Sequence, residues 1–310
     1  MRSGTRIIGV IDDFGSGGAQ RQFVELMCGL VQRGYSVSVF RYNQSENHFI
    51  KKLVDHKVTI LGADKREVGK LGTVRALTKD LKKVEPAFII AFLDNPSLLA
   101  EIACIFFPKA HLLVSERNSR FEEKSFARSL VKRLFHLRSY KVVTNSEDHK
   151  LWLEASFPWL RSRLECVYNG VPSRFFRQPL SRPVRIENRL SVVCIGRISL
   201  EKNPQVLAEA CSIVYNEHGW APSVRWIGRV DTFGAGERVK EEVDEVLEAT
   251  RQKEGWLWHG EAEDIPDLIM DADVVVLSSL HEGLPNAVCE ALATGTPVIA
   301  SDIGDNRKLL

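Results

Sequence analysis

The sequence predicts an α/β protein that contains two doubly wound parallel sheets. Short β-branched runs alternate with longer amphipathic stretches along the chain, which is typical of parallel sheets covered by helices. The length of 310 residues favours two domains of roughly 100–200 residues each. A stretch at 171–188 holds several prolines and little periodicity. We therefore expect an N-terminal domain at 1–170, a linker at 171–188 and a C-terminal domain at 189–310.

In the first domain, short runs rich in β-branched residues predict buried strands, and the amphipathic stretches between them predict helices. The expected strands are 6–12, 35–41, 57–61, 87–93, 110–115, 140–144 and 164–168. The expected helices are 18–33, 69–84, 96–107, 122–138 and 146–156.

The second domain repeats the alternation with shorter connections. The expected strands are 190–195, 223–228, 256–259, 273–278 and 297–300. The expected helices are 203–217, 235–252, 264–271 and 286–294. The chain then ends at Leu310 inside a stretch that should be one more helix, so we expect the C-terminal end to be truncated.

Composition excludes several classes of protein. A net charge of +2 carries no sign of nucleic-acid binding. The six cysteines are scattered, without a C-x-x-C pair or zinc spacing, which indicates reduced thiols. Glu101 interrupts the longest apolar run before it reaches the roughly 18 residues that a membrane span needs. The first strand follows the start so closely that no signal peptide is expected. The sequence therefore predicts a cytoplasmic protein, either free or peripheral at the inner face of the membrane.

The segment 281–292 carries the clearest chemical signal. Glu282 follows a buried strand, and Glu290 lies about one turn into a helix that should start near Asn286. Free backbone N–H groups at a helix start suit an anionic ligand. Two carboxylates beside such a phosphate cradle can accept hydrogen bonds from the hydroxyls of a sugar and of a ribose. This arrangement indicates a nucleotide-sugar site.

A pair of cations, Arg197 and Lys202, follows the first strand of the second domain. Arg197 is expected in the loop and Lys202 at the start of the next helix, capped by the region around Ser199. Basic residues normally avoid a helix N-terminus, so Lys202 there calls for an anion. Such a pair can neutralise a diphosphate as it departs. Two solvated surface charges are the alternative.

Five segments, in order, resemble the retaining glycosyltransferases of family 4, which have the GT-B fold. Glu282 to Glu290 matches the E-x7-E motif of that family. The other four segments are Gly17-Gly18-Ala19-Gln20-Arg21, Tyr168-Asn169-Gly170-Val171, the stretch from Gly196 to Pro204, and Gly260. The resemblance covers nearly the whole chain.

The resemblance implies a fold, a reaction and substrates. Two Rossmann-like domains would face a cleft, and a sugar would move from a nucleotide-diphosphate sugar to a glycan or lipid-linked acceptor with retention of configuration. UDP is the expected nucleotide, with no further cofactor and no metal. Family members usually continue with a C-terminal helix that packs back on the first domain, which is why this chain reads as incomplete.

The resemblance also assigns roles to residues. The expected catalytic residues are Arg197, Lys202 and Glu282. The expected donor-binding residues are Gly17, Gly18, Arg197, Lys202, Gly283, Leu284, Asn286 and Glu290. Many relatives place a histidine after the fifth strand of the first domain, and none stands there in this sequence. The residues expected on the acceptor or sugar side are Asn95, Glu116, Arg117 and Asn118, or these four polar residues only cap loops.

Three other segments resemble known kinds of binding site, and each also has a simpler structural explanation. Residues 15–20 begin like a dinucleotide-binding loop, but Gln20 stands where the third glycine belongs. Asp271 and Asp273 form a D-x-D, which a helix end before a buried strand explains without a metal. The basic, amphipathic stretch 120–141 could rest on anionic lipid headgroups, or it could be a solvated face.

Other functions stay open beside glycosyl transfer. A nucleotide-sugar epimerase of the same fold would share the donor site. A non-catalytic protein that binds a glycan or a nucleotide sugar would also fit. A sugar phosphorylase is disfavoured because no lysine motif for pyridoxal phosphate is present.

Overall fold

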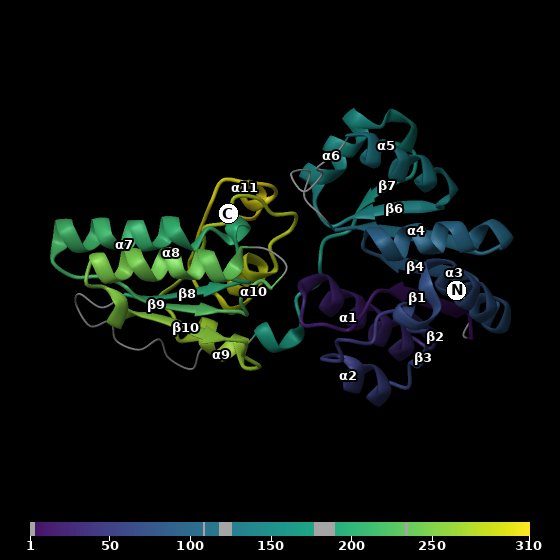
Figure 1. Cartoon of the computed structure of the whole chain (residues 1–310), viewed down its shortest axis with the longest axis horizontal. Helices are drawn as coiled ribbons and strands as arrows, with labels where there is room; N and C mark the ends of the chain where they lie inside the picture. The colour runs from purple at the N-terminus through teal and green to yellow at the C-terminus, as the bar shows by residue number, and fades with distance from the viewer. Residues whose placement is uncertain (1–3, 108, 118–125, 177–189, 233–234) are drawn as a thin grey trace. The chain divides into compact units, whose positions relative to one another are not determined.

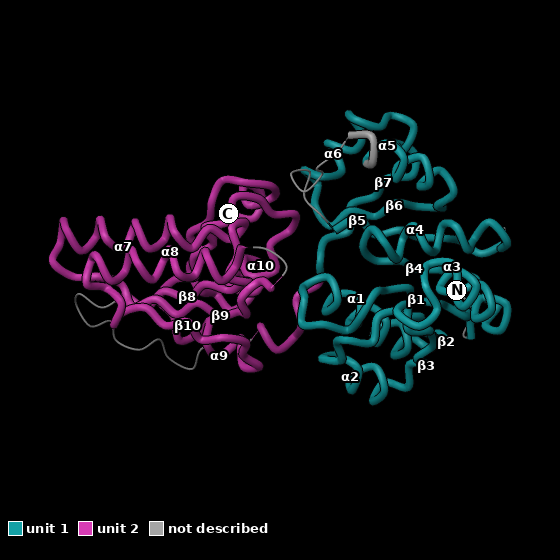
Figure 2. Tube along the Cα trace, viewed as in Figure 1, with its two compact units in different colours: residues 1–169 teal, residues 170–310 magenta. Residues whose placement is uncertain are grey.

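Two parallel sheets organise the chain, one in each of two units, Met1–Asn169 and Gly170–Leu310 (Figure 2). The computed structural model describes residues 4–107, 109–117, 126–176, 190–232 and 235–310. Residues 170–176 belong to the second unit, where Phe175 is fully buried in the core. Most of the predicted linker, residues 177–188, lies outside the described residues.

Unit 1 contains a seven-stranded sheet in the order β3-β2-β1-β4-β5-β6-β7, and every pairing is parallel. The predicted strands are all present. They are β1 (Arg6–Ile11), β2 (Ser36–Arg41), β3 (Thr59–Gly62), β4 (Phe88–Phe92), β5 (His111–Glu116), β6 (Lys141–Thr144) and β7 (Leu164–Cys166). The strand β1 is buried from Ile7 onwards, because helices cover both faces of the sheet.

The helices of unit 1 form the two layers around this sheet (Figure 1). They are α1 (Gly18–Gln32), α2 (Ile50–Asp55), α3 (Lys65–Val84), α4 (Asp94–Ala103), α5 (Phe126–Phe135) and α6 (Glu147–Ser156). Phe23 and Met27 of α1 pack on one face of the sheet, and Leu77 and Leu81 of α3 pack on the other. The sequence missed α2, which has six residues and buries only Leu53. The predicted start of the helix at 122–138 lies outside the described residues.

Unit 2 contains a five-stranded parallel sheet in the order β10-β9-β8-β11-β12. Its strands are β8 (Ser191–Ile195), β9 (Ser223–Ile227), β10 (Trp256–Gly260), β11 (Val274–Leu277) and β12 (Val298–Ala300). Its helices are α7 (Pro204–His218), α8 (Gly236–Ala249), α9 (Ile265–Met270), α10 (Asn286–Thr294) and α11 (Asn306–Leu309). The cores on the two faces contain alternate residues of β8, Val192 with α7 and α8, and Val193 with α9 and α10. The predicted elements of this half are confirmed.

No helix in the described ranges combines the length and the apolar character that a membrane crossing requires. The six cysteines have free thiols, and four of them are buried. These thiols pack as small apolar groups.

Gly228 shows how closely two strand ends approach in unit 2. It follows β9 with a φ of 149°, and a Cβ placed on it would lie 2.1 Å from the carbonyl oxygen of Gly196. Gly219 also has a positive φ, of 73°, but a Cβ there would meet nothing within 4 Å. An alanine at either position would strain the backbone, but only at Gly228 would its Cβ also overlap another atom.

We expect Gly228→Ala to destabilise the protein clearly more than Gly219→Ala, because only the former adds an overlap with backbone. The positive φ alone should cost about 1–2 kcal/mol in the control variant. Denaturant unfolding of both variants measures the two losses. Equal losses would contradict the close approach of the backbone at Gly196 and Gly228.

Candidate active site

The carboxyl ends of β8 and β11 bring together most of the residues predicted to bind a diphosphate. The two strands are neighbours in the sheet and run parallel, so the loops that follow them lie at the same edge. The Ser278 hydroxyl donates to the Lys202 carbonyl at 2.9 Å, and the Leu280 N–H donates to the Glu201 carbonyl at 2.8 Å. One hydrogen bond from a side chain and one between backbones therefore join the two loops.

Lys202 lies before the helix that it was predicted to begin. It ends a short 3-10 helix, Leu200–Lys202, and α7 starts only at Pro204. Asn203, between them, has a left-handed conformation with a φ of 48°. Because a residue before proline avoids the α conformation, the chain cannot continue as one helix through this point. The expected cap by the region around Ser199 is also wrong, since no side chain caps the 3-10 helix.

The Lys202 ammonium forms an ion pair with Glu282 Oε1, although the two residues are 80 positions apart. The exposed fractions of the two side chains are 20% and 13%. The Ser279 hydroxyl donates to the same carboxylate oxygen at 2.7 Å. Gly196 leaves room for the pair, because a Cβ there would lie 3.2 Å from the lysine stem. The structure thus brings together one predicted diphosphate ligand and the carboxylate predicted to face the sugar.

Arg197 follows β8 and is more open than Lys202. Its side chain is 47% exposed and lies 3.6 Å from Glu201 and 3.5 Å from Asp231. Ion pairs at such exposure contribute little to stability. The guanidinium can therefore exchange these carboxylates for another anion at small cost.

The helix α10 begins at Asn286, as predicted, directly after Pro285. No side chain caps its N-terminus, so the first backbone N–H groups lack that partner. Glu290, in the second turn, is only 2% exposed. Of the preceding loop, Leu284 is buried, and Gly283 is half-buried. A buried carboxylate near an uncapped helix start is an arrangement that polar ligands can use.

The predicted glycine loop lies in unit 1, between β1 and α1. Gly17 is the N-cap of α1, and Gly18 is its first residue. A Cβ on Gly17 would lie 2.4 Å from the side-chain oxygen of Gln20, so the flexible Gln20 side chain would have to turn aside. No side chain caps this helix either.

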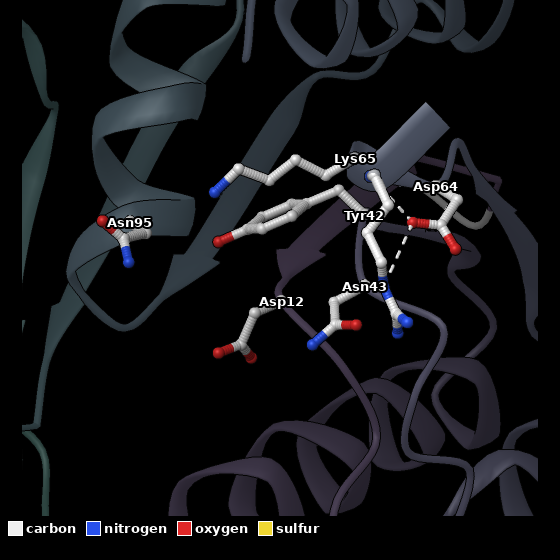
Figure 3. Close-up of a pocket in the computed structure, with 7 residues that line it drawn as sticks. Asp12, Tyr42, Asn43, Asp64, Lys65 and Asn95 are labelled. Carbon is white, nitrogen blue, oxygen red and sulfur yellow. Dashed lines mark hydrogen bonds and ion pairs between the residues drawn. The ribbon is translucent and has the colours of Figure 1, made fainter. Parts of the chain in front are cut away.

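A second polar site lies at the carboxyl edge of the unit 1 sheet. A cavity of about 470 Å³ opens there, and polar side chains line it (Figure 3). The lining residues are Asp12, Tyr42, Asn43, Asp64, Lys65, Arg66 and Asn95. Burial, together with the neighbouring charge of Asp13, raises the pKa of Asp12. Of these seven residues, the sequence predicted only Asn95.

The residues that the sequence missed share one signal. Asp12 follows β1, Tyr42 and Asn43 follow β2, and Asp64 and Lys65 follow β3. Polar residues directly after successive parallel strands meet at one edge of a sheet. The pattern is visible in the sequence once the strand order is known.

The sequence predicts Glu116 on the acceptor or sugar side, but the structure buries this residue in the interior of unit 1. It ends β5, and its side chain is 1% exposed. Its carboxylate pairs with Lys132 at 3.0 Å, Arg133 at 3.1 Å and His136 at 2.6 Å, and His149 lies 3.5 Å away. A buried carboxylate needs such partners, and here they come from the helices that follow β5 and β6. Glu116 is therefore committed to the interior.

Charge pairing shifts the titration of this buried cluster. Burial alone would raise the pKa of Glu116, but the cations Lys132 and Arg133, the hydrogen bond from His136 and the nearby ring of His149 hold it well below its usual range. Burial alone would lower the pKa of His136, but hydrogen bonds with Glu101 and Glu116 raise it to about 9. The shifted pKa values keep Glu116 and His136 charged near neutral pH.

The other residues predicted for the acceptor side have different surroundings. The guanidinium of Arg117 donates to Ser115 at 2.8 Å and to Asn169, and it lies 4.1 Å from the centroid of the Phe92 ring. Burial lowers the pKa of Arg117 to about 10. Asn118 lies outside the described residues, whereas Asn95 lines the cavity.

The basic stretch at 120–141 is not a simple solvated face. Lys132 and Arg133 turn inward to Glu116. The exposed side chains in the described part are largely apolar, with Val131, Leu134, Leu137 and Tyr140 among them. Two of the predicted surface cations thus have a structural role.

Asp271 and Asp273 have structural positions at the end of α9 and before β11. Asp271 is the C-cap of α9. The carboxylate of Asp273 accepts the Ser191 N–H at 2.9 Å, which joins β8 to the start of β11. The described residues contain no group of three or more His, Cys, Asp or Glu side chains that could hold a metal.

Comparison with known families gives matches to both halves of the chain. The family described as "Glycosyltransferase Family 4" matches residues 16–175, which is more than half of the chain. The family described as "Glycosyl transferases group 1" matches residues 189–310.

Curated relatives resemble the chain over different lengths. The UDP-Gal:alpha-D-GlcNAc-diphosphoundecaprenol alpha-1,3-galactosyltransferase of Escherichia coli is 33% identical over 155 residues, which cover 48% of this chain and 39% of the relative. An alpha-1,4-N-acetyl-D-galactosaminyltransferase of Campylobacter jejuni, named for a diNAcBac-PP-undecaprenol-linked substrate, is 25% identical over 91% of this chain and 75% of its own length. Of other relatives the chain spans about half, such as 48% of spore coat protein SA from Bacillus subtilis.

Solved structures share the fold. HepE from Anabaena, in complex with UDP and glucose, superimposes with a TM-score of 0.82 at 18% identity, over 99% of this chain and 83% of that chain. This likeness confirms the predicted GT-B fold of two parallel-sheet domains.

The buried cluster predicts how stability depends on pH. The raised pKa of His136 adds stability that is complete below its ordinary value of 6.5 and is lost as the pH rises through about 9. The lowered pKa of Glu116 adds stability that is present above its ordinary value of 4.5 and is lost on acidification. The free energy of unfolding should therefore fall by up to about 3 kcal/mol between pH 6.5 and 9.5 through His136 alone.

Denaturant unfolding across this pH range tests the prediction. His136→Gln should flatten the alkaline fall, whereas His218→Gln, which changes an exposed histidine, should leave it unchanged. An alkaline profile that His136→Gln does not alter would contradict the assignment.

Proposed function

This chain belongs to glycosyltransferase family 4, and we propose that it transfers a sugar from a nucleotide-diphosphate sugar to a glycan or lipid-linked acceptor, with retention of configuration. One observation carries the proposal. Lys202 and Arg197 follow β8, and Glu282 follows β11. The half-buried ion pair of Lys202 with Glu282 and the exposed ion pairs of Arg197 leave both cations exchangeable at the carboxyl ends of these strands. In open α/β sheets, ligands bind at such strand ends.

The donor diphosphate would bind to Lys202 and Arg197. Each cation is paired with carboxylates, and a diphosphate, with its larger negative charge, would replace them. UDP is the nucleotide that we propose. In support, the E. coli relative is named for UDP-Gal, and the HepE structure contains UDP.

The rest of the donor would bind around the start of α10. Glu290, buried in the second turn, would accept hydrogen bonds from the ribose hydroxyls. Asn286 and the backbone of Gly283 and Leu284 would contact the sugar or the phosphates. Glu282, released from Lys202, would face the hydroxyls of the transferred sugar.

The family resemblance implies the chemistry of the transfer. The bond between the anomeric carbon and the phosphate oxygen breaks, and the acceptor oxygen bonds to the same face of that carbon. The acceptor hydroxyl gives its proton to an oxygen of the departing phosphate. Lys202 and Arg197 stabilise the negative charge that develops on the diphosphate, the kind of electrostatic effect that is often the largest in catalysis.

The acceptor would bind to unit 1, as the family resemblance implies. Two relatives carry undecaprenol-linked diphosphates in their names, which supports a lipid-linked glycan. An epimerase or a binding protein would use the same donor site, and only the product distinguishes them.

We expect the wild-type chain to release UDP from a UDP-sugar and to transfer the sugar when an acceptor extract is present. Lys202→Met and Arg197→Met should each lower turnover by about a hundredfold, because a charge stabiliser of the leaving group is lost. Matched controls are Lys253→Met and Arg238→Met, which remove cations from exposed ion pairs elsewhere in unit 2.

Product analysis decides between the candidate functions. An epimerised nucleotide sugar as the only product would indicate an epimerase, and binding without turnover would indicate a binding protein. Near-normal transfer by both site variants would refute the donor-site assignment.

A further inference from the structure

The cavity in unit 1 is formed by four neighbouring strands. In the order β3-β2-β1-β4, each strand contributes residues from the segment after its carboxyl end. The chain order reverses between β1 and β4, which makes this edge a topological switch point. Ligands of doubly wound sheets bind at such points. A volume of about 470 Å³ also lies within the usual range for small-ligand sites, roughly 300–1,000 Å³.

Backbone hydrogen bonds hold the rim of this cavity in place. The N–H groups of Tyr42 and Asn43 donate to the Asp12 carbonyl at 3.3 Å and 2.9 Å. The Lys65 N–H donates to the Tyr42 carbonyl at 2.8 Å. The three strand-end segments are therefore fixed to one another before any ligand arrives, which lowers the entropy lost on binding.

The side chains of the cavity converge on one space. Figure 3 shows the ammonium of Lys65, the hydroxyl of Tyr42 and the carboxylate of Asp12 directed toward the side of the cavity where Asn95 lies. Lys65 Nζ lies 5.5 Å from the centroid of the Tyr42 ring. The set thus offers an anionic acceptor of hydrogen bonds, a cationic donor and an amide that does both.

The composition of the lining selects among ligands. None of the seven lining residues is aliphatic, so the cavity does not suit a lipid chain. The carboxylates of Asp12 and Asp64 stand beside the cations of Lys65 and Arg66, so the lining is not cationic overall and does not select a phosphate. Closely spaced hydrogen-bond donors and acceptors of both kinds match the hydroxyls of a sugar ring.

We propose that this cavity binds a sugar ring of the acceptor, with Asp12 accepting hydrogen bonds from its hydroxyls and Lys65 and Asn95 donating to its oxygens. The proposal rests on the proposed glycosyl transfer and makes it more specific. The acceptor then ends in a saccharide, and the three residues determine which saccharide is accepted. An acceptor that offers only a lipid phosphate would not fill this site.

Ligand-observed NMR tests the proposal directly. The probes are the methyl α-glycosides of glucose, galactose, N-acetylglucosamine and N-acetylgalactosamine, with inorganic pyrophosphate as the phosphate arm. At least one glycoside should receive saturation from the wild-type protein. Asp12→Asn, Lys65→Met and Asn95→Ala should each weaken its binding about tenfold or more, as expected for lost charge-assisted or amide hydrogen bonds. Asp55→Asn and Lys51→Met, in exposed positions of α2, are the matched controls.

Two further measurements separate the possible failures. Melting temperatures identify any variant that does not fold, and the remaining variants then decide. Calorimetry with UDP should give the same affinity for the wild type and all three site variants. If the wild-type protein does not bind UDP, that result counts against the proposed function and not against the sugar site in this cavity. Sugar binding that survives all three substitutions, or binding of pyrophosphate alone, would overturn the proposal.

Discussion

The ion pair between Lys202 and Glu282 is the interaction on which the candidate active site depends. It links the loops after two neighbouring strands, and both charges are largely shielded from water. Removing one partner of such a pair leaves an uncompensated charge, which is costly. A ligand that separates the pair must therefore bring its own anion for Lys202 and hydroxyl groups for Glu282. A nucleotide-diphosphate sugar carries both, and this match is the physical basis of the proposed donor site.

Unit 1 uses similar side chains in two opposite ways. Around Glu116, carboxylates, cations and histidines are buried and paired with one another, so they hold α5 and α6 against β5. Around Asp12, carboxylates, cations and amides line an open cavity. Burial and pairing, and not composition, separate the structural cluster from the candidate binding site.

Most of the fold could be predicted from the sequence, because strands buried on both faces appear as short apolar runs between amphipathic helices. Less of the site could be predicted. The pairing of Lys202 with Glu282 depends on β8 and β11 being neighbours, which no local pattern specifies. The sequence pattern predicts a helix at Lys202, but Pro204 keeps Asn203 out of the α conformation, so α7 begins only after Lys202. Glu116 follows the pattern of a site residue because it ends a strand. The partners that bury it come from helices later in the chain, which the local sequence does not reveal.

A double-mutant cycle on UDP affinity tests the central claim most directly, with calorimetry on the wild type, Lys202→Met, Glu282→Gln and the double variant. If the diphosphate replaces Glu282 on Lys202, Lys202→Met weakens binding by about tenfold or more. Glu282→Gln then leaves the affinity for UDP unchanged or raises it, and has no effect once Lys202 is absent. Equal weakening by both single substitutions, adding independently in the double variant, would contradict the account.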